Sequence, residues 1–232
     1  MKKDTPLRIL ICCTLFLSVP ATQAQTRVSV TAGFNLSRVS WKESRNGTSI
    51  DNAFNPGYQL GLLTSVPVML HRKSLHLQTG LLFSTKGFRQ DYEDDQGQGV
   101  LVVNPWYGEI PLNILYRIPG NTERFFLGAG AYFAYGLGGR WTMTYRSAWG
   151  WDTGTIEYTD ISRQDPDDQK FNYGRRTDLG INLLAGLIIS KSVFLKLTGQ
   201  AGLKNIAPAE NKKMTKEEFR NRVLTLSAGY RF

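Results

Sequence analysis

The chain has 232 residues, of which 12% are aromatic, and its net charge is +9. This length allows one all-β domain or at most two small domains. The basic residues are scattered rather than grouped with aromatic side chains, which argues against nucleic-acid binding and favours a solvated surface that can face anionic lipid headgroups.

The N-terminal segment has the pattern of a secretory signal peptide. Basic residues accompany a short apolar core, and Ala24 supplies a small residue before the expected cleavage site. The core is too short to span a membrane as a helix, and no run of that length follows it. We therefore assign residues 1–24 to a signal peptide and residues 25–232 to the exported domain. Both cysteines of the chain, Cys12 and Cys13, lie in the signal, which excludes disulfides from the exported domain.

Eight segments of the exported domain alternate apolar and polar residues with a period of two, which is typical of strands with one apolar face. In chain order they cover residues 27–37, 58–66, 75–84, 106–118, 125–137, 177–190, 193–206 and 221–232. The first and last segments are expected to pair and so to close a ring. In the last segment the residues that we expect to face lipid are Leu224, Leu226, Tyr230 and Phe232.

The connections between these segments alternate in length. Long polar connections cover residues 41–55, 89–105, 141–175 and 207–220, and short ones cover residues 67–74, 119–123 and 190–192. Transmembrane β-barrels have an even number of strands, short periplasmic turns and long extracellular loops. We therefore predict an all-β fold: an eight-stranded antiparallel up-and-down transmembrane β-barrel with four long extracellular loops. A soluble lipocalin-type barrel also has eight strands, but its apolar face points inward, and alternation alone leaves both architectures open.

Three features favour the membrane. Aromatic residues fall near both ends of the strands, as expected for the two interfacial girdles of a barrel. The polar faces contain mostly small residues, which suits the lumen of a small barrel. The terminal strand needs a partner, because an open edge in lipid would leave unpaired backbone groups. The expected girdle residues are Trp41, Tyr58, Trp106, Tyr107 and Trp141 near the long loops, and Tyr116, Phe125, Phe194 and Phe232 near the short turns.

Several phrases of the sequence resemble the PorT-like outer-membrane β-barrel family. The phrase Tyr107-Gly-Glu-Ile-Pro-Leu-Asn-Ile-Leu-Tyr116 resembles the fourth strand of that family, and residues 126–139 are similar to its fifth. Gly202-Leu-Lys-Asn-Ile206 resembles a further phrase, with Lys204 in place of the family's threonine, and residues 223–232 match its closing strand. The resemblance covers essentially the whole exported domain and implies an eight-stranded barrel in the bacterial outer membrane.

The polar face of the predicted barrel carries charged residues that would lie inside it. Glu109 falls on this face, and a hairpin symmetric about Gly97–Gln98 would place Lys86 directly opposite. A carboxylate in a narrow barrel needs such a partner, because an unpaired buried charge is costly. We interpret these charges as a structural plug, and a gate or proton-sensitive switch is the functional alternative. The predicted network is completed at other depths by Arg117, Asp178 and Lys196.

Two loop features are candidates for ligand contact. Trp149 and Trp151 are unusual in a polar loop and predict a contact site for an extracellular protein or glycan, with burial against the barrel rim as the alternative. The other feature is an acidic cluster in the connection 89–105, which lacks the ordered spacing of a calcium loop, so we interpret it as a solvated loop without metal. The acidic residues are Asp91, Glu93, Asp94 and Asp95.

Catalysis and cofactors are not expected. The only histidines, His71 and His76, fall at the predicted periplasmic end, away from the outer rim where enzymes of this architecture need a nucleophile and a base. We predict an outer-membrane protein of structural or interaction type whose function is carried by its extracellular loops. A small-solute porin or transporter and an accessory component of protein secretion are the alternatives, although eight strands leave a lumen just filled by side chains.

The expected partners are of three kinds. They are outer-membrane lipid, the barrel-insertion machinery during biogenesis, and an extracellular protein or glycan. The PorT-like resemblance implies that the insertion machinery recognises the terminal Phe232. Nucleic acid is not expected as a partner.

Overall fold

The structure, a computed structural model, describes residues 26–42, 49–50, 52–68, 74–94, 97–119, 124–145, 150–159, 170–208 and 217–232. Its strands are β1 (Arg27–Lys42), β2 (Ser49–Ile50), β3 (Asn55–Pro67), β4 (Leu75–Thr85), β5 (Phe88–Asp94), β6 (Gly97–Arg117), β7 (Phe125–Tyr145), β8 (Gly150–Tyr158), β9 (Lys170–Gly174), β10 (Thr177–Ile188), β11 (Val193–Gly202) and β12 (Glu218–Arg231). Within these ranges no helix is long and apolar enough to cross a membrane.

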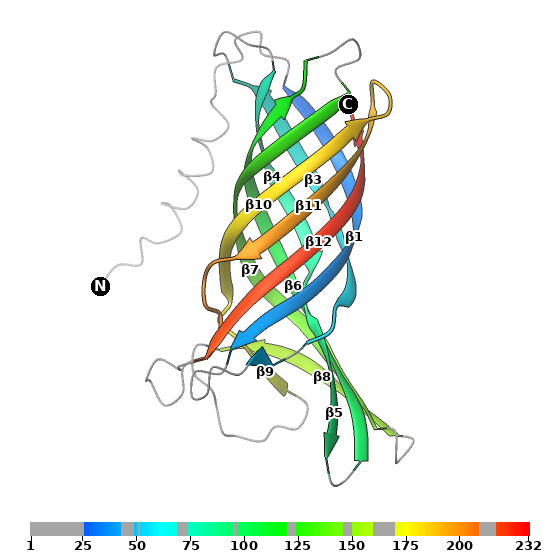
Figure 1. Cartoon of the computed structure of the whole chain (residues 1–232), viewed down its shortest axis with the longest axis vertical. Helices are drawn as coiled ribbons and strands as arrows, with labels where there is room; N and C mark the ends of the chain where they lie inside the picture. Colours follow the sequence, from blue (N-terminus) through cyan, green and yellow to red (C-terminus); the bar gives the residue numbers. More distant parts are fainter. Residues whose placement is uncertain are drawn as a thin grey trace, which may run out of the picture.

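Eight of these strands form a closed antiparallel barrel (Figure 1). Around the ring the order is β1, β3, β4, β6, β7, β10, β11 and β12, and β12 returns to pair with β1. Ala228 of β12 lies opposite Leu195 of β11 on one side and Ala32 of β1 on the other. The predicted eight-stranded antiparallel barrel is therefore confirmed, as is the pairing of the first and last segments.

The apolar face of each strand points outward, which excludes the lipocalin-type alternative. Leu81 and Leu183 are each 66% exposed, whereas Asn35 and Thr225 are fully buried inside the ring. This arrangement inverts that of a water-soluble protein, because soluble monomers rarely expose a continuous apolar belt. The period of two seen in the sequence thus separates a lipid-facing surface from a polar lumen.

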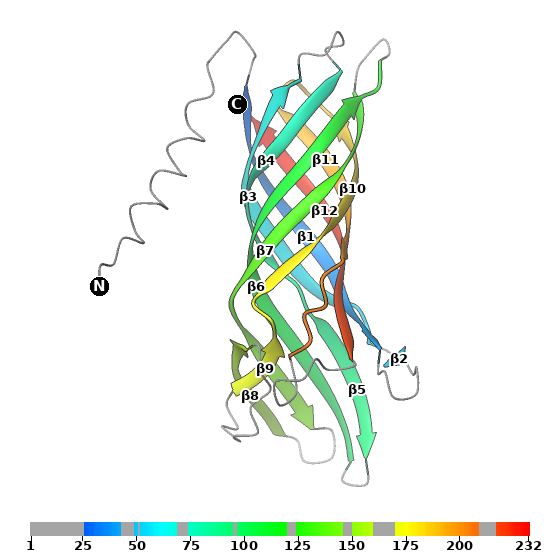
Figure 2. The ribbon, with the colours of Figure 1, turned by 90° about the vertical axis from the view of Figure 1, so that its left-hand side faces the viewer.

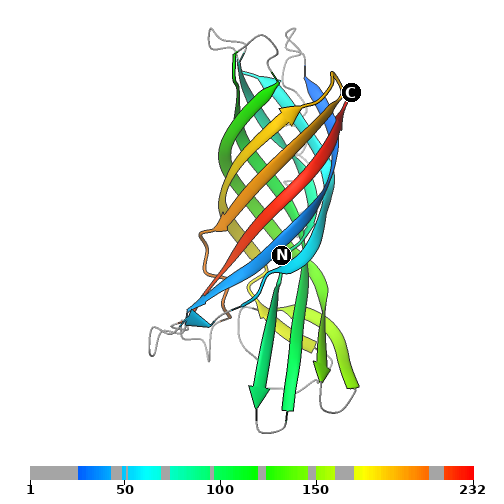
Figure 3. The same cartoon turned by 45° about the vertical axis from the view of Figure 1, so that its right-hand side comes forward.

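The two ends of the barrel differ. One, here called the turn end, holds the short connections, the start of β1 and the end of β12 (Figure 1). At the other, here called the loop end, β6 and β7 run on beyond the ring (Figures 2 and 3). There β6 pairs with β5, β7 pairs with β8, and β9 adds to β8 in parallel. We call this sheet the β-extension.

The β-extension corrects two predicted loops. The connections 89–105 and 141–175 were expected to be loops, but β5, β8, β9 and the outer parts of β6 and β7 lie within them. The segment Phe88–Asp94 is mostly charged and polar, and its two aromatic residues, Phe88 and Tyr92, are too few to mark an apolar strand face. A register shift between Trp106 and Tyr107 marks the place where β6 leaves the ring.

Apolar side chains fill the lumen near both ends. The loop-end plug is a buried cluster made of Val39, Phe88, Val103, Tyr107, Tyr132, Ala134, Ile156, Tyr158, Tyr173, Ile206, Ala207 and Phe219. The turn-end plug is smaller and consists of Leu115, Phe126, Leu184 and Phe194. Edge-to-face contacts hold the rings together, such as Tyr107 on Tyr158 at 5.7 Å between centroids. The polar middle of the lumen is therefore enclosed between two apolar layers.

The plugs also correct the expected aromatic girdles. Tyr107 and Phe194 point into the lumen, and Trp41 and Trp141 pack against the loop-end plug. These four do not face lipid. Trp41, Tyr107 and Phe194 have lumen-facing parity on their strands, and Trp141 follows the register shift at Gly136–Gly138, which reverses the parity of β7. Tyr58, Tyr116, Phe125 and Phe232 are exposed on the outer surface, and Trp106 is partly buried beside the ring of Phe83.

Candidate functional site

Three charged side chains meet in the middle of the lumen. The Lys86 Nζ lies 3.2 Å from Glu109 Oε1 and 3.9 Å from Asp178 Oδ2, and all three side chains are shielded from solvent. We call them the charge triad. It combines one ammonium group with two carboxylates in a region without bulk water. Such a group is tolerated only when further hydrogen bonds satisfy its members.

Neutral donors supply these hydrogen bonds. Asp178 Oδ2 accepts from the Tyr132 hydroxyl at 3.0 Å and from Asn221 Nδ2 at 2.9 Å. Glu109 Oε2 accepts from Gln200 Nε2 at 3.1 Å. The Lys86 ammonium also lies 4.2 Å from the centroid of the Tyr132 ring, a cation–π distance. Each charge of the triad therefore has partners beyond the ion pairs themselves.

The route by which Lys86 reaches Glu109 differs from the predicted one. Leu82, not Lys86, lies opposite Glu109 in the β4–β6 ladder. The predicted register was wrong because the β5–β6 ladder pairs Asp94 with Gly97, so it is not centred on residues 97–98. Lys86 follows β4 at the junction with β5, and its long side chain extends along the lumen to the carboxylate.

A chain of amide side chains continues the network across the barrel. Gln200 Nε2 donates to Asn182 Oδ1 at 3.2 Å, and Asn182 Nδ2 donates to Asn113 Oδ1 at 3.1 Å. Asn113 Nδ2 donates in turn to Gln78 Oε1 at 3.4 Å. The side chains come from β11, β10, β6 and β4, so the network ties strands from different sides of the ring.

Two tyrosines of the β-extension form hydrogen bonds at the loop end, and one of them, Tyr173, joins this network. The Tyr173 hydroxyl donates to Asn221 Oδ1 at 3.3 Å, and the Tyr158 hydroxyl donates to the Trp106 carbonyl at 3.3 Å. Both residues belong to strands outside the ring. Burial raises the pKa of Tyr173 and of Tyr158 well above the ordinary value, so both hydroxyls remain donors.

The structure separates the other two predicted lumen charges from the triad. Lys196 of β11 is buried but forms no ion pair with any described residue. Arg117 lies at the turn end, where it lines a small cavity with Arg27, Arg231 and His76. The five predicted charges are therefore distributed over the whole depth of the lumen, and only Lys86, Glu109 and Asp178 are in mutual contact.

The described residues of the two predicted loop sites lie in β5 and β8, outside the ring. Trp151 of β8 is 72% exposed, and Trp149 lies outside the described residues. In the acidic cluster, Asp91 pairs with Arg89 at 3.2 Å, Glu93 Oε1 accepts from Gln98 Nε2 at 2.8 Å, and Asp95 is outside the described residues. Across the described ranges, no three His, Cys, Asp or Glu side chains gather as a metal-binding set.

Sequence reasoning missed the neutral half of the network. Tyr132, Asn182, Gln200 and Asn221 were not singled out, although each has the parity of a lumen-facing residue on its strand. Parity within each strand was the available signal, such as that of Asn182 relative to Asp178 and of Gln200 relative to Lys196. With both lumen ends closed and the triad paired, the arrangement is suited to holding the barrel together rather than to binding a reactant.

Comparisons with known proteins agree with this architecture. A family model described as "Outer membrane protein beta-barrel domain" matches residues 23–207. A search of curated proteins gives no match. Among solved structures, Ail, the attachment invasion locus protein of Yersinia pestis, in complex with the heparin analogue sucrose octasulfate, is 14% identical. The match covers 89% of this chain and 99% of Ail, with a TM-score of 0.42.

Two further solved structures are similar over most of the chain. OprG from Pseudomonas aeruginosa is 14% identical over 90% of this chain and 97% of its own, with a TM-score of 0.38. Neisserial surface protein A is 10% identical over 89% of this chain and 97% of its own, with a TM-score of 0.39. At these identities and TM-scores the solved structures carry no argument about function.

Proposed function

Because this chain belongs to the outer membrane protein beta-barrel domain family and lies in the bacterial outer membrane, we propose that it is a surface interaction protein with a structural lumen. In this class of barrel the turn end is periplasmic and the loop end is extracellular. The β-extension therefore projects from the cell. We propose that it binds an extracellular protein or glycan and that the barrel serves as its anchor.

One observation carries this proposal: the chain builds an ordered sheet outside the membrane while it fills the lumen with side chains. Paired side chains support the outer hairpins, as where the Tyr145 hydroxyl donates to Asp152 Oδ2 at 3.0 Å. β5 lies at the end of the sheet order, and on its side away from β6 the described backbone pairing is the Ala53–Arg89 bridge. An open strand edge can accept a strand of a partner, and the exposed Trp151 adds an aromatic anchor.

The test is a barrel without the outer hairpins. Arg89 lies opposite Val102, and Thr142 lies opposite Thr153, so an Asn-Gly turn can replace residues 90–101 and residues 143–152 without a change of register. Crosslinking on intact cells, followed by quantitative mass spectrometry, should recover surface partners with the full chain and lose them with the shortened one. Equal recovery by both proteins would place binding elsewhere on the barrel and contradict the proposal.

A small-solute channel is the alternative function, and conductance separates the two. We expect no steady conductance steps from the purified protein in planar bilayers, because both plugs block the lumen. The double substitution Phe126→Ala and Phe194→Ala, which removes rings from the turn-end plug, should still give a closed barrel because the loop-end plug remains. A general porin reconstituted in parallel is the positive control. Steady steps from the unmodified protein would support the channel.

Within the family, the PorT-like phrase at residues 107–116 supports a place near the PorT-like barrels. An accessory role in protein secretion is therefore a second alternative to surface binding. We propose no catalysis for this chain. His76, the one histidine that the structure describes, is buried at the turn end, away from the extracellular rim.

The terminal residue offers a test of the proposed insertion partner. The Phe232 side chain is 75% exposed, and its backbone N–H donates to the Val28 carbonyl at 3.0 Å. We expect deletion of Phe232 to reduce the heat-modifiable, folded protein in the outer-membrane fraction several-fold. Phe125→Ala, which removes another exposed aromatic side chain at the turn end, is the control and should insert normally. Normal insertion after the deletion would remove this role and leave the barrel as described.

A further inference from the structure

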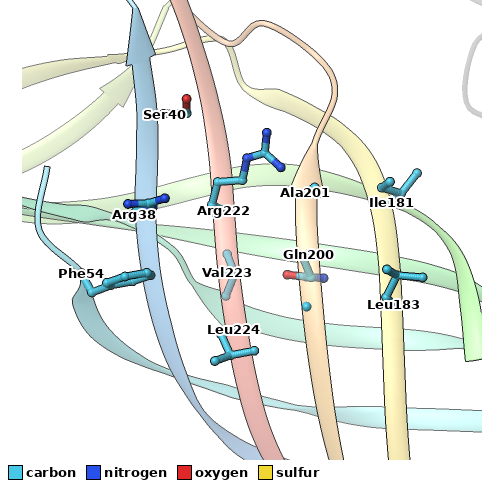
Figure 4. Close-up of a pocket in the computed structure, with 11 residues that line it drawn as sticks. Arg38, Ser40, Phe54, Ile181, Leu183, Gln200, Ala201, Arg222, Val223 and Leu224 are labelled. Carbon is cyan, nitrogen blue, oxygen red and sulfur yellow. The ribbon is translucent and has the colours of Figure 1, made fainter. Parts of the chain in front are cut away.

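A groove on the outer surface of the barrel combines basic and apolar side chains (Figure 4). It has a volume of about 480 Å³ and runs over β1, β12, β11 and β10 near the loop end. We propose that it binds a phosphorylated lipid of the outer leaflet, with a phosphate held by Arg38 and Arg222 and an acyl chain lying over Gly199.

The groove is built from two neighbouring rungs of the sheet. Along the outer rung, cross-strand pairing places Arg38, Arg222, Ala201 and Ile181 side by side. Along the next rung toward the membrane centre it places Leu36, Leu224, Gly199 and Leu183 side by side. All of these positions have outward parity, so a basic rung lies directly above an apolar one.

Small residues on β11 create the depression. Gly199 has no side chain, while Leu224 and Leu183 on the flanking strands are well exposed. A Cβ built at Gly199 would meet no heavy atom closer than the Leu183 carbonyl oxygen at 4.0 Å. The next outward position of β11, on the basic rung, is Ala201, whose side chain is a single methyl group. A furrow one side chain wide therefore runs between two rows of larger residues and opens onto the basic rung.

The two arginines of the basic rung lie side by side without a counterion among the described residues. Arg38 and Arg222 are direct cross-strand partners, and like charges in this position destabilise a sheet. Neither forms an ion pair with a carboxylate of the described chain. Arg38 is oriented by the ring of Phe54, whose centroid lies 5.1 Å from the guanidinium carbon. A phosphate between two guanidinium groups would relieve the repulsion and accept several charge-assisted hydrogen bonds.

The position of the groove selects a lipid as the occupant. Its lower part is continuous with the apolar belt that faces the acyl chains, and its basic rung lies at the extracellular edge of that belt. Arginines at this depth meet lipid headgroups. A soluble anion would contact only the basic rung and would leave the furrow over Gly199 empty. The two parts together fit an anionic headgroup joined to an acyl chain.

The test is native mass spectrometry of the full-length exported chain in detergent, titrated with bis-phosphorylated lipid A or with the same lipid after removal of its phosphates. The unmodified protein should bind the phosphorylated form about tenfold or more tightly than the other. The double substitution Arg38→Gln and Arg222→Gln should lose this preference. Gly199→Leu should weaken binding of both lipids, because its side chain fills the furrow.

Two matched variants control for charge and for size. Arg140→Gln removes an exposed arginine of β7, and Gly108→Leu fills an outward glycine of β6 whose added Cβ would have its nearest contact at 3.8 Å. Both should bind as the unmodified protein does, and heat-modifiable gel mobility should show all variants folded. Equal binding of the two lipids, unchanged binding by the double variant or by Gly199→Leu, or displacement of the lipid by inorganic phosphate would each overturn the proposal.

Discussion

Replacing Lys86 with methionine should lower the free energy of unfolding of the barrel by about 3–5 kcal/mol. The substitution leaves Glu109 and Asp178 buried without their shared cation, while methionine fills a similar volume. The neutral donors to the carboxylates do not replace a charge. Urea unfolding in detergent micelles, followed by tryptophan fluorescence and by gel mobility, measures the change.

Lys196 provides the matched control. It is also a buried lysine of the lumen, but it has no ion-pair partner among the described residues, so Lys196→Met should leave stability unchanged or raise it. The triple change Lys86→Met, Glu109→Gln and Asp178→Asn removes every charge of the triad and should recover most of the loss. Equal losses for Lys86→Met and Lys196→Met would show that the triad does not stabilise the barrel.

Substitution of Gly130 by valine should cost about 3 kcal/mol or more, at the upper end of the effects of overpacking. Gly130 of β7 lies directly between Asn113 of β6 and Asn182 of β10, and the hydrogen bond between these two amides passes over it. A Cβ at this position would lie 2.1 Å from the Leu112 carbonyl oxygen and 2.6 Å from the Asn113 Cα. The clash involves backbone, so no side-chain rotation relieves it.

The measurement is the folded fraction in the outer membrane together with the urea midpoint of the purified protein. Gly108→Val is the control, because Gly108 faces outward and its added Cβ would have room. It introduces the same side chain on a neighbouring strand and should fold as well as the unmodified protein. A Gly130→Val protein of normal stability would mean that the β6–β7 ladder can widen without loss.

The sequence predicts the ring itself well, since every barrel strand separates apolar and polar residues by parity. Leu224 and Leu226 alternate with Thr225 and Ser227, and the structure keeps that division through the middle of the barrel, between the two plugs. Parity also predicts the correct side of the sheet for two residues that were assigned to the girdles. Tyr107 shares the parity of Glu109, and Phe194 that of Lys196, so both belong in the lumen.

Alternation of apolar and polar residues could not predict the β-extension or the register of its β5–β6 ladder. Strand β5 lies outside the membrane and has few apolar residues, so its charged sequence resembles that of a loop. The register of the β5–β6 ladder therefore could not be predicted, and the residue opposite Glu109 was misassigned for the same reason. The pairing of the triad depends on the length of the lysine side chain, which relaxes the need for an exact register.

The bonds across the lumen also bear on how the barrel assembles. The Thr225 hydroxyl donates to Asn35 Oδ1 at 2.8 Å, although 190 positions of the chain separate them, and Asn221 reaches Asp178 from the same last strand. Until β12 arrives, these groups and the charges beside them lie on an open sheet, and exposing them to hydrocarbon costs several kcal/mol for each unsatisfied group. The polar lumen groups of a partly inserted chain therefore oppose its release into lipid. Its last strand completes the ring and the polar network in one event, so we expect release into the membrane to be all-or-none.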